Sequence, residues 1–427
     1  MPRVLILSKQ GDGVPLAIRL AEEGHGVDIY IQDSKAKGSL KGYERPRVID
    51  RPTRVKDKAY DLVLADMVGL GNLCEEFTKS GHLVLGGGLL NDKLELDRDY
   101  GTKVIEKLTK VKEADSVKCT TVDQINNILN QSVHPKVIKP LGNKTVDLTL
   151  VSGDDENRSL KTIVGQWGDK LIPCIIQEMI KGVEISTEGW FNGKEFIKPF
   201  NHTFERKRLM EGDKGPQTGC MGNIVIPSQG DRLTDMALKP LEPLLEKAGY
   251  IGPIDVNCIL SGNDAYFLEF TTRFGYDAIQ AWTELLKMPL FDFLFHVASG
   301  GGDLVKNTEY RNDYAIAVRL SVAPYPSHKG AEQWKGIQVL NLEDHNARRH
   351  VWLSDVMRNG KTQLMAGVDG VIGCVTARGI SIGECRNRVY RTINNIVIHK
   401  DVQYRRDIGE GVEMQIGQFK RWCDAED

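Results

Sequence analysis

The sequence lacks long apolar runs and an excess of charge of either sign. Its 427 residues include 56 lysines and arginines against 58 aspartates and glutamates, a formal net charge of -2. The apolar stretches are far shorter than the roughly 20 residues that cross a bilayer, and the opening MPRVLILSKQGDG enters a strand without a signal-peptide pattern. We therefore expect an unexported, cytoplasmic protein with no membrane partner and no general attraction to nucleic acid.

Motifs of several protein classes are missing as well. The eight cysteines are scattered and form no CxxC pair, so we expect reduced thiols rather than a zinc cluster or a disulfide framework. There is no GxxxxGK[ST] P-loop and no kinase-type catalytic loop. No Ser-His-Asp or Cys-His set indicates a covalent nucleophile.

What is present begins with an alternation of strands and helices. The length exceeds what one hydrophobic core usually supports, so we expect two or three domains. RVLILS, DIYIQD, DLVLAD and HLVLGGG predict strands of a doubly wound α/β domain that ends near residue 88. The first loop has Gly11 and Gly13 without the third glycine of GxGxxG, so both a tight turn and a phosphate cradle stay open.

The rest of the chain mixes helices and strands. A helix is predicted at 97–111, and an amphipathic helix at 231–250. Residues 299–313 are the best candidate for a linker, before a small α+β region. Between the two helices we expect the strands HPKVIKPLGN, DLTLVSG, CIIQEM, EISTEGWF and KEFIKPFNH.

One predicted hairpin carries an acid on each strand. Residues 252–275 combine two apolar runs with the turn Ser-Gly-Asn-Asp, and they include Asp255 and Glu269. If the strands pair these two positions, like charges become direct neighbours, which is destabilising unless a cation lies between them. We expect that cation to be Mg²⁺.

Basic and acidic residues follow one another in an order that suits a nucleoside triphosphate. Such a ligand needs cations on its phosphates, an apolar slot with backbone groups for the base, an acid for the ribose and carboxylates for Mg²⁺. The sequence supplies Lys103, then Lys139 and Lys144, then the stretch 178–184, and then the hairpin acids.

This order resembles the ATP-grasp superfamily, and within it the phosphoribosylamine-glycine ligase family. The matching stretches are GTKVIEK, PKVIKPLGNK, IIQEMIKGVEIS, RKRLMEGDKGPQTGCMG, YFLEFTTRFG, GCVTARG and YRRDIG. The resemblance implies an α/β ATP-grasp fold with an N-terminal doubly wound, Rossmann-like domain (1–98), an ATP-grasp domain (99–310) whose mobile lid covers about 115–180, and a small C-terminal α+β domain (311–427).

The resemblance also implies a set of ATP-binding residues. Lys103 and Lys139 are similar to the lysines that hold the phosphates, and Lys144 falls in the lid loop. Glu184 occupies the place of the ribose acid. The segment expected to contact adenine consists of Gln177, Glu178, Met179 and Ile180.

Metal and substrate residues follow in the same way. Glu269 resembles the family's Mg²⁺ (or Mn²⁺) ligand; Thr271 stands where relatives have asparagine, and Asp255 offers a compensating carboxylate. The glycine-rich stretch KGPQTGCMG is expected to hold an anion in a loop. The residues placed beside the reacting groups are Arg273, Lys207, Arg208 and Gly219.

The reaction implied is ATP-driven amide formation, in which glycine or a similar amino acid becomes an acyl phosphate and a phosphorylated amine displaces phosphate. Closure of the lid would protect that intermediate from water. The assembly expected is a monomer or homodimer.

The first loop leaves alternatives open. Where the family has Gly-Gly-Arg-Glu-His, this sequence reads Lys9-Gln10-Gly11-Asp12-Gly13, and 67–69 replace a Gly-Pro-Glu segment. Lys9 with the N-H groups of Gly11 and Gly13 could still receive a phosphate at a helix N-terminus. A paralogue that uses a different amine is one alternative, and a degenerate nucleotide-binding protein, suggested by Thr271, is another.

Overall fold

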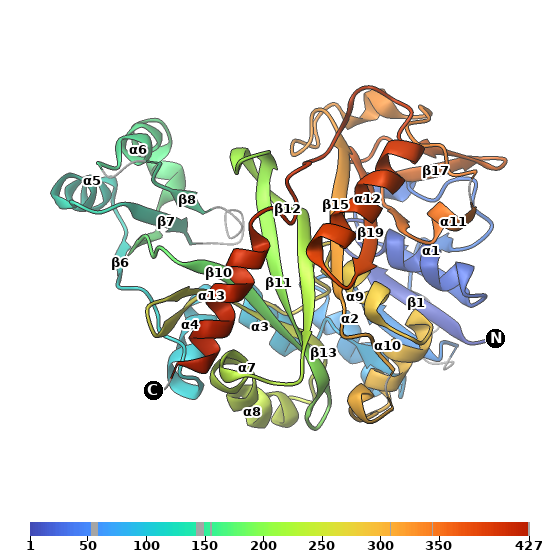
Figure 1. Ribbon diagram of the computed structural model, residues 1–427, viewed down its shortest axis with the longest axis horizontal. Helices are drawn as coiled ribbons and strands as arrows, with labels where there is room; N and C mark the ends of the chain where they lie inside the picture. Colours follow the sequence, from blue (N-terminus) through green and yellow to red (C-terminus); the bar gives the residue numbers. More distant parts are fainter. Residues whose placement is uncertain (53–58, 142–148, 154–155, 308, 344, 426–427) are drawn as a thin grey trace.

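The computed structural model describes the chain except for residues 53–58, 142–148, 154–155, 308, 344 and 426–427. Within the described part, the strands form sheets of five, four and nine strands and a ribbon of β17 (Val356–Asn359) with β18 (Thr362–Met365). Figure 1 shows the four-stranded sheet and its helices standing apart at one side of the molecule. None of the described helices is both long enough and apolar enough to cross a bilayer.

The five-stranded sheet is parallel, with the order β3-β2-β1-β4-β5. Val4 and Ile6 pack with α1 (Val14–Glu22) on one face, whereas Leu5 and Leu7 pack with α2 (Gly71–Lys79) on the other. The doubly wound prediction is therefore confirmed. The strands are β1 (Arg3–Ser8), β2 (Gly26–Ile31), β3 (Arg47–Ile49), β4 (Leu62–Ala65) and β5 (Val84–Leu85).

The four-stranded sheet has a core of its own. Its antiparallel strands run in the order β6-β9-β7-β8 and are β6 (Ser116–Cys119), β7 (Lys136–Pro140), β8 (Leu150–Val151) and β9 (Cys174–Glu178). Helices α5 (Val122–Gln131) and α6 (Arg158–Leu171) contribute Ile125 and Leu160 to a buried cluster separate from the main core. These residues form a compact unit that one short segment joins to β10.

The nine-stranded sheet is antiparallel and has the order β14-β13-β10-β11-β12-β15-β19-β16, with β20 on β15. It crosses the predicted boundary near residue 311, because β12 pairs with β15. The division of the chain into three domains stays a prediction. The strands are β10 (Val183–Asn192), β11 (Phe196–Met210), β12 (Lys214–Ser228), β13 (Ile251–Ser261), β14 (Asp264–Thr271), β15 (Tyr314–Val322), β16 (Val351–Leu353), β19 (Val371–Gly379) and β20 (Val402–Gln403).

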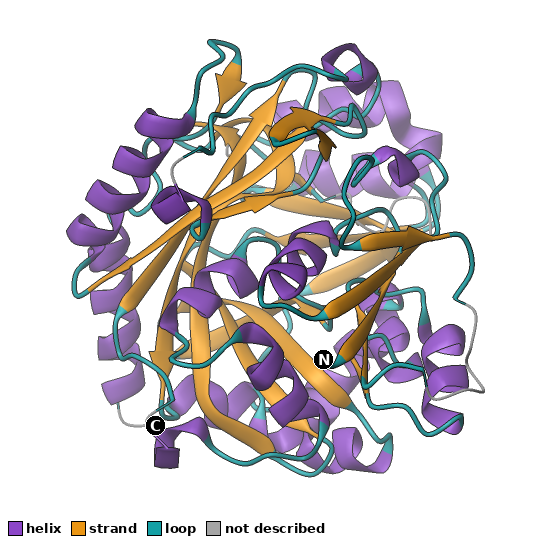
Figure 2. Ribbon diagram, turned by 90° about the vertical axis from the view of Figure 1, so that its right-hand side faces the viewer, coloured by secondary structure: helices purple, strands orange, loops and turns teal. Residues whose placement is uncertain are grey.

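Helices cover this large sheet, as Figure 2 shows. The single helix expected at 231–250 is wrong: α7 (Arg232–Ala237) and α8 (Glu242–Lys247) are separated by a short turn. Pro240 and Pro243 lack the N-H that a continuous helix needs. The other helices are α3 (Leu89–Leu96), α4 (Arg98–Leu108), α9 (Ala278–Leu285), α10 (Leu290–Ala298), α11 (His345–Arg348), α12 (Ile382–Ile396) and α13 (Val412–Asp424).

The contact between β12 and β15 requires a glycine at position 222. Gly222 has φ +148°, and a Cβ atom there would lie 2.6 Å from the carbonyl oxygen of Ala317. We predict that Gly222→Ala lowers the free energy of unfolding by about 2–4 kcal/mol, because the strand must shift away from its neighbour. Urea denaturation measures the change.

Gly165 in α6 is the matched control, since a Cβ there meets nothing within 4 Å. Gly165→Ala should raise stability by up to about 1 kcal/mol, because alanine favours helix. If both variants unfold at the same urea concentration as the parent, the close approach of β12 and β15 does not constrain the fold.

Candidate functional site

Polar side chains gather on one face of the nine-stranded sheet, over β10, β11, β13 and β14. Directly paired residues of neighbouring strands share a face, as do alternate residues of one strand. The register and the contacts between the side chains assign Glu184, Ser186, Glu188, Glu205, Lys207, Asp255, Asn257, Glu269 and Thr271 to this face.

The predicted hairpin exists, but its register differs from the one expected. Asp255 lies opposite Thr271, and Asn257 lies opposite Glu269, so the two acids are diagonal neighbours. Near the turn the strands follow a regular register, which a bulge after Asn257 shifts by one residue. Without that bulge Glu269 would pair with Val256 and point to the other face, because a one-residue slip reverses the side chains.

Asn257 connects Asp255 with Thr271 and is a site residue that the sequence reasoning missed. Its Nδ2 donates to Asp255 Oδ1 at 3.4 Å and to Thr271 Oγ1 at 3.2 Å. Its Oδ1 accepts from Ser186 Oγ at 2.6 Å. The signal in the sequence was its place two residues after Asp255 in a predicted strand, which puts both on one face.

A lysine supplies the positive charge that the acids require. Lys207 Nζ lies 3.2 Å from Glu184, 3.5 Å from Glu269 and 3.7 Å from Glu205. Burial alone would lower the pKa of Lys207, but these carboxylates raise it well above its usual range. The ammonium group therefore stays charged, and its ion pairs link β11 to β10 and β14.

Two further cations reach Glu269 from outside the sheet. Lys139 of β7 donates to the carbonyl oxygen of Leu268 at 3.3 Å, and burial lowers its pKa to about 8. Arg98, the first residue of α4, is close enough for its charge to act on both Lys139 and Glu269. Although burial opposes its ionisation, Glu269 has a lowered pKa because Lys207, Lys139 and Arg98 surround it.

The sequence prediction did not include Arg98 but named Lys103, five residues further along α4. Lys103 is exposed on that helix, and among the described residues it forms no contact with the acids or with Lys139. Its role in phosphate binding stays a prediction, and Arg98 is the better placed cation. Lys144 lies outside the described residues.

The predicted adenine segment forms the crossing between two sheets. Gln177 is buried at the end of β9, and Glu178 forms an ion pair with Lys136 at 2.9 Å. The N-H of Met179 donates to the carbonyl oxygen of Pro135 at 3.0 Å. Ile180 then leads towards β10, where Glu184 lies half-exposed. The stretch thus lies beside the polar face, at its border with the four-stranded sheet.

Arg273 is held at the end of β14 by an acid from α3. Its Nε donates to Glu95 at 2.8 Å, and the same carboxylate accepts the N-H of Thr272 at 2.7 Å. The guanidinium lies 4.4 Å from the centre of the Tyr276 ring. Glu95 and Tyr276 were not predicted as site residues, and they fix the direction in which Arg273 points.

The glycine-rich stretch KGPQTGCMG is a strand rather than the predicted loop. It forms the first half of β12 and pairs with β11. Arg208 donates to the carbonyl oxygen of Gly215 at 2.9 Å, which stabilises this hairpin. At Gly219 a Cβ atom would lie 3.0 Å from the Tyr276 ring, so a glycine there allows the ring to pack against β12.

Three buried acids of the polar face have raised pKa values. Burial raises the pKa of Glu188 to about 8 and that of Glu205 to about 7, and it raises the pKa of Asp255 as well. Like-charge repulsion adds to this effect: Glu205 raises the pKa of Glu188, and Glu188 and Glu205 both raise the pKa of Asp255. Near neutral pH the face therefore retains protons that an added cation would displace.

The first loop differs from the prediction that it could receive a phosphate. The N-H of Gly13 donates to Asp66 Oδ2 at 2.6 Å, and the N-H of Gly11 donates to Ser8 Oγ at 2.9 Å. The N-terminus of α1 is thus occupied by the carboxylate of Asp66, which leaves these two donors committed. Lys9 lies beside Gly69, since a Cβ there would be 2.9 Å from its Nζ.

Asp12 brings the first loop to the polar face. Burial raises its pKa, and the charges of Arg273 and Arg319 act on it in the opposite direction. The Asp12 carboxylate is in turn the largest cause of the raised pKa of Tyr276. Asp12, Arg273 and Tyr276 therefore meet where the carboxyl ends of the parallel strands approach β14, a usual position for ligands in α/β proteins.

Comparison with known families agrees with this geometry. Residues 97–278 match the model of the phosphoribosylglycinamide synthetase ATP-grasp (A) domain. This part of the chain is therefore similar to the ATP-grasp domain of that family. The matched range includes the predicted site residues, from Lys103 to Arg273, and leaves the altered first loop outside.

Relatives extend the likeness beyond the ATP-grasp domain. Phosphoribosylamine-glycine ligase of Helicobacter pylori is 26% identical over 95% of this chain and 96% of its own length, and that of Clostridium acetobutylicum is 26% identical over 79% and 81%. The crystal structure of phosphoribosylamine-glycine ligase from Thermotoga maritima superposes with a TM-score of 0.67, at 22% identity, over 95% of this chain and all of the other. The ATP-grasp fold is thereby confirmed.

The burial of Glu188 predicts a pH dependence of stability. A carboxyl whose pKa rises from 4.5 to about 8 on folding favours the native state below pH 4.5 and loses that contribution as the pH rises to 8. Glu188→Gln removes the group, so we predict that the variant is more stable than the parent by about 1–3 kcal/mol at pH 7. The difference should shrink towards pH 4.5.

Denaturation by urea at pH 5, 6, 7 and 8 measures this difference. Glu195→Gln is the control, because Glu195 is an exposed glutamate near the β10–β11 turn. A gap between parent and Glu188→Gln that stays constant from pH 5 to pH 8 would mean that Glu188 is ionised in the folded protein.

Proposed function

We propose that the chain is an ATP-dependent ligase that joins the carboxylate of glycine to an amine, 5-phosphoribosylamine by likeness to its relatives. The observation that carries this proposal is the convergence of Lys207, Lys139 and Arg98 on Glu269. Three cations around one carboxylate, beside the crossing between two sheets, suit a triphosphate held together with a metal ion. Soluble biosynthetic chemistry in the cytoplasm is the expected setting.

Each part of the nucleotide has residues that suit it. Lys139, Arg98 and Lys207 suit the phosphates, and the half-exposed Glu184 suits the ribose hydroxyls. Adenine would stack against the segment 177–180, with the four-stranded sheet as the lid above it. The predicted roles of Lys103 and Lys144 remain part of this proposal only as additional contacts at the phosphates.

A divalent cation fits the donors of the polar face by type. Within the described residues no three His, Cys, Asp or Glu side chains form a metal cluster, but the oxygens of Glu269, Asp255, Asn257 and Thr271 share the face. Mg²⁺ is usually held by one or two carboxylates together with substrate phosphates. When bound there, Mg²⁺ or Mn²⁺ neutralises phosphate charge and orients the terminal phosphate.

The chain's own part in the reaction is positioning and charge neutralisation. The glycine carboxylate attacks the γ-phosphorus of ATP, which forms an acyl phosphate and releases ADP; the amine then attacks the acyl carbon, and phosphate leaves. Arg273, fixed by Glu95, suits the carboxylate or the transferred phosphate. Arg208 and Gly219 hold β12 against Tyr276 at the edge of this space.

Glu269→Ala tests the proposal. We predict a loss of glycine-dependent ADP formation of about 10³-fold or more, because the phosphates lose the metal carboxylate. Hydroxylamine can replace the amine and trap an activated glycine as its hydroxamate, so the first step is measured without knowing the second substrate. Glu195→Ala should retain parental activity, and thermal unfolding should show that both variants fold.

Unchanged hydroxamate formation by Glu269→Ala would remove the metal role of this residue. ATP binding without any hydroxamate in the parent would instead favour the degenerate nucleotide-binding alternative.

A second candidate function, ligation to a different amine, is favoured by one observation. The carboxylate of Asp66 already occupies the N-terminus of α1, where the phosphate of the amine was expected. We predict that with 5-phosphoribosylamine and ribosylamine as alternative substrates, kcat/KM differs by less than about tenfold, since the N-H groups of Gly11 and Gly13 are already engaged by Ser8 and Asp66. A preference of 100-fold or more for the phosphorylated amine would refute this second candidate.

A further inference from the structure

A cavity lies beside the C-terminal end of α1. It has a volume of about 640 Å³ and is lined by residues of α1, α9, β19 and α12 and by the segments before β15 and β16. Figure 1 shows α1, α9 and α12 together in the half of the molecule opposite α5 and α6. None of the residues proposed above for ATP, metal or substrate lines this cavity.

The lining is strongly basic although the chain as a whole is not. The sequence has nearly equal numbers of basic and acidic residues, whereas this cavity has two glutamates against six arginines. The arginines are Arg19, Arg311, Arg349, Arg378, Arg388 and Arg391.

The two glutamates are engaged with other groups. Glu23 accepts the N-H groups of Leu290 and Phe291 at 2.8 and 3.0 Å, which caps the start of α10. Glu284 accepts from Thr376 at 2.6 Å and contacts His350 at 2.7 Å. Among the described residues, neither carboxylate forms an ion pair with an arginine of the lining, although both lie close enough for their charge to act on Arg19.

Two of the arginines have ion-pair partners outside the cavity. Arg378 pairs with Asp313 at 2.9 Å. Arg388 pairs with Glu384 on the same helix and donates to the carbonyl oxygen of Arg378 at 2.8 Å. These contacts fix the positions of two guanidinium groups along β19 and α12.

The other four arginines form no ion pair with any described carboxylate. Arg19 stacks on the Trp352 ring at 3.9 Å, and Arg311 donates to a backbone carbonyl at 2.6 Å. Among the described residues, the Arg349 side chain donates to the amide oxygen of Asn346 at 3.5 Å, and Arg391 is exposed on α12. Glu22, Glu23 and Glu284 lie close enough for their charges to act on Arg19. The lining still has six arginines against two glutamates, and a concave site with a net positive charge attracts anions.

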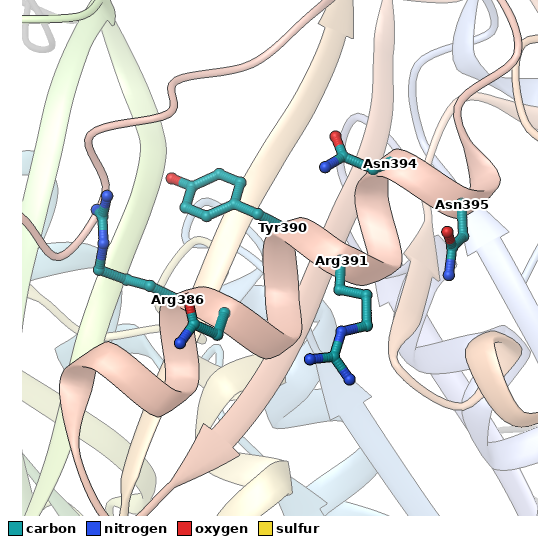
Figure 3. A pocket seen from close by; sticks show the side chains of 6 residues that line it. Arg386, Tyr390, Arg391, Asn394 and Asn395 are labelled. Carbon is teal, nitrogen blue, oxygen red and sulfur yellow. The ribbon is translucent and has the colours of Figure 1, made fainter.

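Arg391 also borders a smaller cavity of about 410 Å³ on the outer side of α12. Figure 3 shows its guanidinium extending away from Asn394, while Arg386 and Tyr390 lie further along the helix. The basic surface therefore continues from the larger cavity onto α12.

We propose that the 640 Å³ cavity is a second ligand site, for a small molecule that carries one or more phosphate groups. The planar guanidinium group forms paired hydrogen bonds with phosphate oxygens, which makes arginine the usual residue for such recognition. The volume lies within the range of about 300–1,000 Å³ that is typical of small-molecule sites. Its concave shape favours such a ligand over a nucleic acid strand.

The cavity is distinct from the proposed nucleotide site, because it shares no lining residue with that site. It is also distinct from the first loop, which lies with Asp66 at the N-terminus of α1, whereas Arg19 and Glu23 lie in and after the last turn of that helix. A ligand in the cavity would contact α1 and α12, which come from the first and the last parts of the chain.

Isothermal titration with inorganic pyrophosphate tests the proposal. The protein is first saturated with a non-hydrolysable ATP analogue, so that the phosphate positions of the nucleotide site are filled. We expect one further molecule of pyrophosphate to bind to the parent, and we expect its Kd to rise at least tenfold in the double variant Arg349→Ala/Arg391→Ala. Both side chains are exposed and lack an acidic partner among the described residues, so the variant should fold normally.

Arg421→Ala on α13 is the matched control, because Arg421 is likewise exposed on a helix but lies outside both cavities. Its Kd should equal that of the parent. Equal affinity in the double variant, no binding to the parent, or binding of a single-stranded oligonucleotide but not of pyrophosphate would each overturn the proposal. These outcomes measure binding and not turnover, so they test the second ligand site independently of the proposed ligase function.

Discussion

The neutralisation of acids by Lys207 is the interaction on which the polar face depends. Glu184, Glu205 and Glu269 come from three strands, and like charges on neighbouring strands destabilise a sheet. One ammonium group within 4 Å of all three makes their positions compatible. A cation was expected between the hairpin acids; the protein itself places Lys207 of β11 3.5 Å from one of them, Glu269.

Around this centre, the charges are arranged in pairs that fix geometry. Glu95 holds Arg273, and Lys136 holds Glu178, each at less than 3 Å. Such pairs contribute little stability where they are exposed, but they orient the charged groups before a ligand arrives. Arg98 and Lys139 approach Glu269 from outside the sheet, so two separate parts of the chain must come together to complete the phosphate site.

Helix α1 separates two chemically different environments. Its N-terminus faces the first loop, where Asp66 accepts the N-H of Gly13 and Asp12 lies close to Arg273. Beyond its last turn lies the cavity with six arginines. This helix of nine residues therefore has acidic side chains at its N-terminus and basic side chains near its C-terminus. That arrangement matches the helix dipole, which favours negative charge at the N-terminus and positive charge at the C-terminus.

Much of the fold and part of the site followed from the sequence alone. The parallel strands of the first sheet, the 252–275 hairpin and the ATP-grasp fold were predictable, because apolar periodicity and spaced motifs are local properties of the chain. Glu184, Lys207 and Glu269 could be named because the motifs that contain them resemble those of a known family. Tertiary structure decided which of the candidates meet. A one-residue bulge set the face of the sheet on which Glu269 lies, and α4 places Arg98 rather than Lys103 near the acids. The packing of α1 places the Asp66 carboxylate at the N-terminus of that helix. Each of these depends on contacts between residues far apart in the chain, which no local pattern encodes.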